Sequence, residues 1–171
     1  MSTPTTGDFI QYNGSAYTTA FPNFPYIKVS QTNSASNISA NGFHFISFDT
    51  VEQSSHNIFS TTNYYHIDVP AGVYMVLLNL GWNIISNGAG ASFVSSIIQR
   101  GTTTPGPSAD FVYDSGPQNL PNANGRQVTT PSVITSLSSA GTIRFLLYLW
   151  NQTINLYGGA RTNQAYIIKI G

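Results

Sequence analysis

The chain has 171 residues, 41% of them hydrophobic, which is enough for one domain with a two-layer core. Charged residues make up only 7%, compared with about 25% in a typical soluble domain, and the six basic residues are scattered along the chain. This excludes the clusters of Lys and Arg that nucleic acid or an anionic membrane requires, and the absence of cysteine excludes disulfides and thiolate metal sites.

Residues 1–42 are predicted to form an extended N-terminal arm. Pro4, Pro22 and Pro25 are incompatible with a regular helix, and aromatic residues recur between them. Because disordered tails are poor in aromatics, we expect the arm to lie against its own domain or a neighbouring subunit, and to anchor the protein to a larger particle or stalk. The alternative is a flexible linker. No signal peptide and no membrane-inserting segment is predicted.

Residues 43–171 are predicted to form one β domain, because short runs rich in β-branched and aromatic residues alternate with turn residues. Residues 43–48 and 64–69 alternate as half-buried strands do, and a turn is expected at residues 54–57. Pro70-Ala71-Gly72 then turns the chain into the longest strand, residues 73–82. This strand is apolar on both faces, so we expect both faces to be covered, one of them by another subunit.

The remaining strands are expected at residues 93–100, 127–135, 143–150, 154–157 and 165–170, with Pro131 marking a bulge or an edge. Residues 102–126 form the least regular segment, and long loops of this kind carry function or cover a sheet edge. Altogether the pattern predicts an all-β sandwich or barrel. Loss of the last strand is expected to unfold it.

Four stretches of the chain resemble the globular head of the q subunit of the first complement component, a family that shares its jelly roll with tumour necrosis factor. They are residues 45–49, 66–74, 137–145 and 166–170, and the Val69-Pro70-Ala71-Gly72-Val73-Tyr74 turn is the most specific of them. The resemblance implies a tumour necrosis factor-like jelly-roll β-sandwich of about 8–10 antiparallel strands and a homotrimer. Two features depart from the family. Thr142 stands where the family has Asp, which puts an inherited ion contact in doubt, and no collagen-like stalk precedes the head.

The resemblance also implies that aromatic residues of the long strands pack around a three-fold axis. The candidates for this interface are Tyr74, Trp82, Phe145, Tyr148, Trp150 and Tyr166. Each large aromatic side chain buries about 150–250 Å². The alternative for each of the six is the core of its own subunit.

The loops offer a candidate binding face for a glycan or protein receptor. Exposed aromatic rings beside amides, as in jelly-roll lectins, suit sugar rings and their hydroxyls. The candidates are Tyr113, Asn119, Asn122, Arg126 and Arg161, each with the alternative of an ordinary turn residue.

No residue pattern in the chain indicates catalysis, a metal or a cofactor. The chain has only six carboxylates and three histidines, none with diagnostic spacing. Asp110 and Asp114 suit a solvated loop better than a calcium site, because the alternating acidic pattern is missing. We therefore expect a protein that is not an enzyme and has no cofactor.

The composition suits a protein that assembles. A formal charge of zero removes electrostatic protection against self-association, and cysteine-free β proteins rich in Ser, Thr and Asn are typical of particle shells. The hypothesis is a trimeric head or spike on a virus, phage or spore surface that presents its loops for host attachment. The alternatives are a secreted lectin or cytokine-like recognition module, and a jelly-roll capsid subunit.

Overall fold

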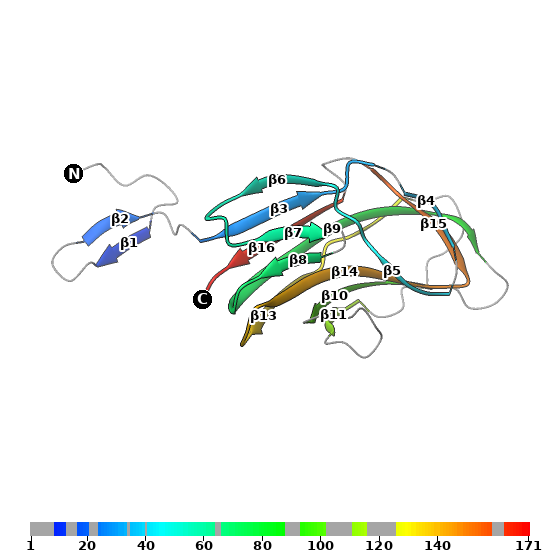
Figure 1. The fold of residues 1–171 in the computed structure, drawn as a ribbon. Helices are drawn as coiled ribbons and strands as arrows, with labels where there is room; N and C mark the ends of the chain where they lie inside the picture. Colours follow the sequence, from blue (N-terminus) through cyan, green and yellow to red (C-terminus); the bar gives the residue numbers. More distant parts are fainter. Residues whose placement is uncertain are drawn as a thin grey trace.

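The computed structural model describes residues 9–12, 17–20, 24–33, 35–39, 41–63, 66–87, 93–101, 111–115, 126–158 and 163–171. In these ranges the chain forms β-strands joined by turns and bends, and no helix that could cross a membrane is found there. All the described strands except the first two build two antiparallel sheets that face each other as the layers of a sandwich, and the first two form a small sheet of their own (Figure 1). The predicted all-β sandwich is therefore confirmed.

The first layer, here called the β9 sheet, is organised around the longest strand. Its strands are β3 (Tyr26–Ser30), β4 (Ala35–Ser39), β6 (Thr50–Ser54), β9 (Gly72–Asn87), β12 (Arg126–Thr129), β13 (Ser132–Leu137), β15 (Gln152–Leu156) and β16 (Gln164–Lys169). Their order is β4-β15-β9-β16-β3-β6, and β12 and β13 pair with the other edge of β9. The C-terminal strand β16 thus lies inside the sheet, hydrogen-bonded to β9 and to β3.

The second layer, here called the β14 sheet, contains the other two-faced strand that the sequence predicts. Its strands are β5 (Gly42–Phe45), β7 (Ser60–Asn63), β8 (His66–Val69), β10 (Phe93–Gly101), β11 (Phe111–Asp114) and β14 (Gly141–Trp150). Their order is β11-β10-β14-β8-β7. Strand β5 pairs with the second half of β14, beyond the part that pairs with β8.

Pro131 interrupts the strand that the sequence predicts over residues 127–135. The two parts, β12 and β13, both pair with β9, in the same register on each side of the gap. Proline has no N–H to donate to a strand ladder. Its carbonyl still accepts the backbone N–H of Leu78 at 2.9 Å, so β9 keeps this hydrogen bond across the interruption.

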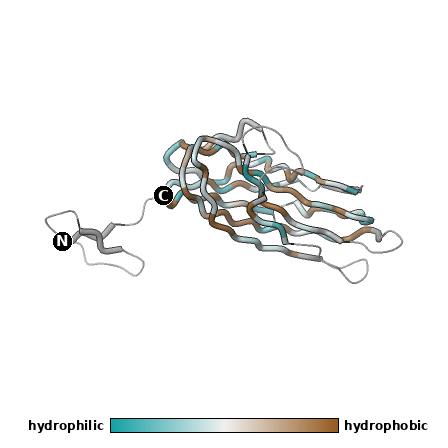
Figure 2. The backbone as a smooth tube through the Cα atoms, turned by 90° about the horizontal axis from the view of Figure 1, so that it is seen from below, coloured by the Kyte–Doolittle hydropathy of each residue, from teal (hydrophilic) through white to brown (hydrophobic). Residues whose placement is uncertain are grey.

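The core lies between the two sheets and is built from aromatic and branched aliphatic side chains. Its largest fully buried members are Trp82 and Tyr74 from β9 and Phe145 from β14. Phe48 meets Phe145 edge to face, with ring centroids 5.3 Å apart, a favourable aromatic geometry. Figure 2 shows hydrophobic residues distributed along the strands of both layers.

The turn from β8 into β9 has a clear physical basis. Gly72 has a φ of 156°, and a Cβ there would lie 2.7 Å from the backbone oxygen of Gly171. A side chain at this position would therefore push the C-terminus out of its place beside β9. The hydroxyl of Tyr74 donates a hydrogen bond of 2.6 Å to the carbonyl of Pro70, which closes the same turn from the core side.

The sandwich begins well before residue 43, which changes the predicted extent of the arm. Strand β3 pairs with both β16 and β6, and its Ile27 and Val29 are only 2% and 1% exposed. Strand β4 is an edge strand of the β9 sheet. Residues 26–39 therefore contribute strands to the sandwich and are not a separate arm. The prolines and aromatic residues of this segment predict an extended arm. A proline also fits directly before a strand, and Pro25 stands directly before the buried strand β3.

The part of the predicted arm that stays outside both sheets is the β1–β2 hairpin. Among the described strands, β1 (Phe9–Tyr12) and β2 (Tyr17–Ala20) pair only with each other, and they lie beside the sandwich in Figure 1. An anchoring or subunit-contacting role of the arm therefore concerns the residues before 24.

A single carboxylate ties the β3–β4 turn to the loop after β5. Asp49 accepts hydrogen bonds from the backbone and hydroxyl of Thr32, the backbone and amide of Asn33, and the hydroxyl of Thr50. Burial raises the pKa of the Asp49 carboxyl, but these hydrogen bonds outweigh it and lower the pKa from 3.8 to about 2. The charged form is thus the one that the fold stabilises.

This clamp predicts an acid-sensitive contribution to stability. Because the folded pKa of Asp49 lies below the unfolded one, the contribution is present above pH 3.8 and is lost as the pH falls towards about 2. We expect Asp49→Asn to cost about 1 kcal/mol at neutral pH and to flatten the loss of stability in this acid range. Urea unfolding at several pH values measures both effects. Glu52→Gln on β6 is the comparison for losing one negative charge, because the Glu52 carboxylate accepts a single hydrogen bond from the described side chains, from the Ser30 hydroxyl at 2.6 Å, and a glutamine oxygen can keep it.

Candidate self-association surface

The face of the β9 sheet that points away from the core carries apolar side chains on several neighbouring strands. Along β9, Tyr74, Val76 and Leu78 point into the core and are buried. Successive side chains of a strand point to opposite faces. Val73, Met75 and Leu77 therefore point outward, where they are only partly buried.

The register of the neighbouring strands extends this apolar strip across the sheet. Directly opposite residues in antiparallel strands share a face. One row runs through Ile134, Met75, Ile168 and Tyr26, and the next runs through Ser132, Leu77, Tyr166 and Lys28. Together with Val73 these residues are called the outer face below. Ile134 is 65% exposed, and the rest of the outer face holds only one charged side chain.

That charged side chain, Lys28, is placed over an aromatic ring. Its Nζ lies 5.5 Å from the centroid of the Tyr166 ring, a cation–π distance, so the lysine stem covers part of the ring. The Tyr166 hydroxyl meets Gln164 Oε1 at 3.3 Å. The outer face is therefore an apolar strip with a polar margin.

A shallow cavity of about 290 Å³ lies on this margin. It is lined by Leu77, Leu78, Asn79, Thr130, Pro131, Gln164 and Tyr166. Asn79 Oδ1 is buried and has no hydrogen-bond partner among the described residues. A buried amide oxygen without a partner is unfavourable.

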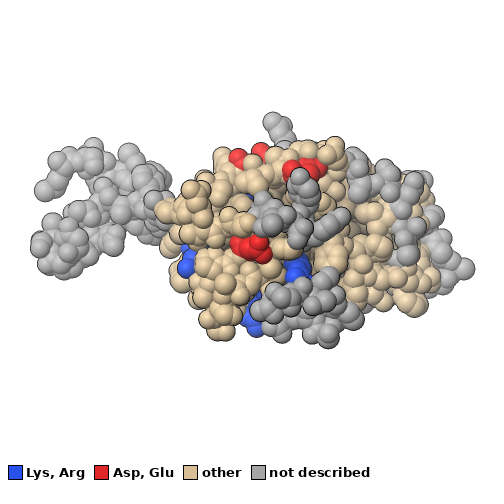
Figure 3. Space-filling view, viewed as in Figure 1, with Lys and Arg blue, Asp and Glu red and all other residues tan. Residues whose placement is uncertain are grey.

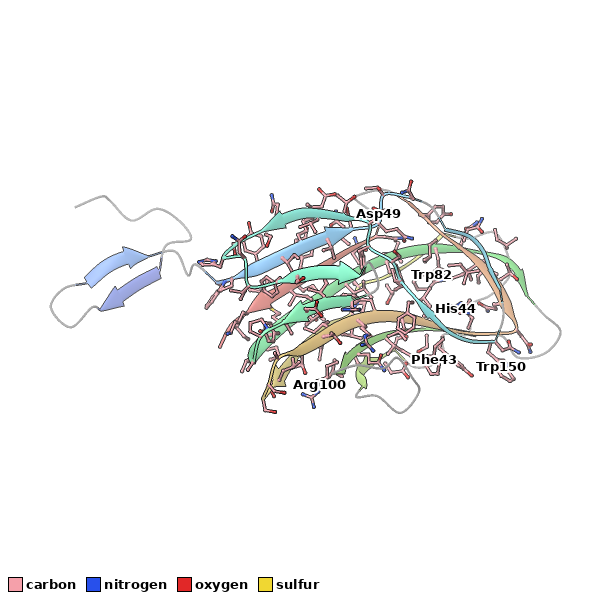
Figure 4. All side chains as sticks on the ribbon, in the orientation of Figure 1. Phe43, His44, Asp49, Trp82, Arg100 and Trp150 are labelled. Carbon is pink, nitrogen blue, oxygen red and sulfur yellow. The ribbon has the colours of Figure 1, made fainter. Side chains whose placement is uncertain are left out.

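The six aromatic residues predicted for a three-fold interface lie in three different places. Tyr74, Trp82 and Phe145 are buried in the core of one subunit, which is the alternative that the sequence left open for them. Burial raises the pKa of Tyr74 to about 12. Trp82 lies between the layers in Figure 4.

The other three candidates lie on opposite sides of the sandwich. Tyr166 belongs to the outer face of the β9 sheet. Tyr148 and Trp150 alternate with the buried Leu147 and Leu149 along β14, so they point away from the core on the β14 sheet. A single interface cannot contain all three, and of the six only Tyr166 lies on the outer face.

The sequence alone missed the aliphatic members of the outer face, Met75, Leu77, Ile134 and Ile168. The signal was present, because residues 73–82 are apolar at both odd and even positions. What the sequence lacked was the register, which places Ile134 and Ile168 on either side of Met75.

The candidate binding residues of the loops are only partly described. Tyr113 lies on β11 and packs partly against the core, and Arg126 begins β12 opposite Asn83. Asn119, Asn122 and Arg161 lie outside the described residues. Thr142, at the position where the resembling family has Asp, donates a hydrogen bond of 2.8 Å from its hydroxyl to the carbonyl of Gly101.

The polar groups of the described residues do not gather into a metal site. His66 Nε2 and Asp68 Oδ1 are 3.3 Å apart on β8, but no group of three or more His, Asp or Glu side chains forms in the described part of the chain.

Comparison with known proteins shows the fold. Neither the protein-family models nor the curated protein sequences give a match. Three crystal structures of murine APRIL, at pH 8.0, 5.0 and 8.5, are similar to this chain, with TM-scores of 0.63, 0.62 and 0.60 and identities of 8%, 9% and 9%. Each alignment covers 86% of this chain and 99% of the APRIL chain. The chain has a tumour necrosis factor-like jelly roll, as the sequence resemblance implied.

Proposed function

We propose that this chain is a non-enzymatic head module that assembles as a homotrimer through the outer face of its β9 sheet and presents its loops to a receptor. The observation that carries the proposal is the outer face itself. Its two rows and Val73 form a largely apolar strip, with Ile134 as its most exposed hydrophobic member, on strands whose other face already forms the core. Apolar patches that a soluble protein exposes in this way mark interaction sites.

A second copy of the chain fits the chemistry of this surface. Lys28 is its only charged group, and the whole chain has a formal charge of zero, so copies meet without strong repulsion. A three-fold arrangement is what the resemblance to the complement and tumour necrosis factor heads implies. In such an arrangement the three outer faces would meet around the axis and leave the β14 sheets outside.

The proposed place of action is the surface of a virus, phage or spore particle. The support is compositional, since the chain is poor in charge, free of cysteine and rich in Ser, Thr and Asn. The residues before 24, which include the β1–β2 hairpin in its own two-stranded sheet, would attach the head to the particle or to a stalk. A jelly-roll capsid subunit would instead build a closed shell, which the particle mass distinguishes.

The alternative function is a secreted, extracellular recognition module, either cytokine-like or lectin-like. The similarity of the fold to murine APRIL favours this alternative. Both functions use the same assembled head, and they differ in whether the residues before 24 bind a particle.

The outer face is tested by placing a charge on it. We expect wild-type protein to have the mass of a trimer in solution, and Ile134→Asp to have the mass of a monomer, because an unpaired carboxylate would be buried between copies. Light scattering measures both masses. Val51→Asp is the matched control. Val51 is also an exposed strand residue, at 45%, but it does not belong to the outer face, because it lies opposite the core-facing Val29. A monomeric wild type, or an Ile134→Asp protein that stays trimeric, would rule out this surface.

A further inference from the structure

An aromatic cluster lies on the opposite side of the sandwich from the outer face. Phe43 on β5 is paired with Tyr148 on β14, and their ring centroids are 4.8 Å apart. Trp150 follows Tyr148 on the same side of β14 and is 40% exposed. Figure 4 shows Phe43 and Trp150 near each other, on the side of β14 away from Trp82. These three side chains are called the aromatic cluster below.

Hydrogen-bonding side chains border the aromatic cluster at two edges. At one edge, the side-chain oxygen of Asn41 accepts the backbone N–H of Asn151 at 2.7 Å, and Asn151 has a left-handed φ of 53°. At the other edge, Ser95 lies opposite Tyr148 and donates a hydrogen bond from its hydroxyl to Asp114. Amide groups thus lie at one edge of the rings, and a hydroxyl and a carboxylate lie at another.

Among the Lys and Arg side chains that the structure describes, none is an accessible cation beside the aromatic cluster. Arg144, the basic residue of β14, is 4% exposed and lies four residues before Tyr148. In Figure 3 the Lys and Arg atoms that can be seen lie in the left and central parts of the molecule, away from the end where Figure 4 places Trp150. An anionic ligand would therefore find no charge partner among the described side chains at the aromatic cluster.

We propose that the aromatic cluster binds a neutral carbohydrate. The C–H face of a pyranose ring is apolar and packs on aromatic rings, whereas its hydroxyls both donate and accept hydrogen bonds. The side-chain oxygens of Asp114 and Asn41 each already accept a hydrogen bond, and a carboxylate or amide oxygen can accept a further one from a sugar hydroxyl. A nucleic acid would also stack on aromatic rings, but it needs cations along its backbone. An apolar peptide would pack on the rings but would make no use of the amide and carboxylate groups at their edges.

The proposal does not depend on self-association. The aromatic cluster belongs to the β14 sheet and the outer face belongs to the β9 sheet, so one surface stays accessible when the other is covered. It also differs from the receptor-binding loops proposed above, because its residues come from strands β5 and β14. Failure of one proposal therefore leaves the other in place.

Tryptophan fluorescence provides the experiment. The chain has two tryptophans, and Trp82 is 1% exposed, so Trp150 is the one that a ligand can reach. The full chain is titrated with glucose, galactose, mannose, N-acetylglucosamine and their disaccharides, up to high millimolar concentration. We expect a saturable change in fluorescence with at least one of these sugars.

Variants of Trp150 assign the binding to the aromatic cluster. We expect Trp150→Ala to weaken binding by about tenfold, measured by calorimetry, and Trp150→Phe to recover part of the loss. Val51→Ala is the control, because it also removes an exposed apolar side chain, on the edge strand β6. Trp150 is partly exposed at the end of its strand, so equal thermal midpoints for the wild type and the variants are expected.

Three results would overturn the proposal. The first is the absence of saturable binding to every neutral sugar in the panel, and the second is unchanged affinity in Trp150→Ala. The third is a lower assembly mass of Trp150→Ala by light scattering, which would show that the aromatic cluster contacts another copy. The mass of Ile134→Asp, measured in parallel, reports on self-association separately.

Discussion

Removal of residues 1–40 is expected to prevent folding of the sandwich, whereas removal of residues 1–23 is expected to leave it folded. The longer truncation deletes β3, which lies between β16 and β6 and buries Ile27 and Val29 in the core. Deleting a buried aliphatic side chain costs about 2–5 kcal/mol, and here two are lost together with two strand ladders. The sum is comparable to the total stability of a domain, about 5–15 kcal/mol.

The two truncations differ mainly in whether β3 and β4 are present, which makes them a matched pair. Far-ultraviolet circular dichroism and the thermal unfolding midpoint measure the outcome. The shorter truncation removes β1 and β2, which pair only with each other among the described strands. If both truncated proteins keep the wild-type midpoint, β3 contributes little to the core. The boundary between arm and β domain would then lie at residue 42, as the sequence predicts. If both unfold, the hairpin is part of the folding unit.

The strands with strong local patterns could be predicted from the sequence. The alternation of residues 66–69 and the turn at Pro70 predicted a half-buried strand followed by the longest strand, and Ile67 and Val69 are indeed buried. The turn at residues 54–57 is also present, with His56 and Asn57 both in the left-handed region. Local conformational rules suffice here because each signal lies within a few residues.

The contacts between distant strands could not be predicted in the same way. Alternation along β9 separates Tyr74 from Met75, but it does not say which set faces the other sheet. The sequence therefore leaves both an interface and the core open for the large aromatic residues of β9, and the structure places Tyr74 and Trp82 in the core. Strand β3 shows the same limitation, since a run of five residues after Pro25 gives a weak signal until β16 pairs with it.

Asn163 is the clearest case of a residue whose role comes only from the tertiary structure. It is 0% exposed. It stands directly before β16 and connects this strand to β9 and to the end of β3, which are far apart in the sequence. Its Oδ1 accepts the backbone N–H of Gly81 at 2.8 Å, and its Nδ2 donates to Gln31 Oε1 at 2.8 Å. Its backbone carbonyl also accepts the N–H of Gln31 at 3.0 Å.

These hydrogen bonds lie where β9 changes its partner strand. Before this point β9 pairs with β16, up to Asn79, and after it β9 pairs with β15, from Trp82 onward. Gly81 falls between the two ladders, and its N–H would otherwise have no strand partner there. A buried N–H must be paired, so the Asn163 amide is what allows one long strand to serve two partners.

Asn163→Ala is therefore expected to lower the free energy of unfolding by about 3 kcal/mol, since the Gly81 N–H and the Gln31 amide both lose a buried partner. Urea unfolding of Asn163→Ala and wild type in the Ile134→Asp background measures the difference without a contribution from assembly, which would make stability depend on concentration. Gln164→Ala is the neighbouring control. Its partly exposed amide accepts only a 3.3 Å contact from Tyr166, so a loss below about 1 kcal/mol is expected. Equal losses in the two variants would mean that water replaces the buried amide and that Asn163 does not connect the two halves of β9.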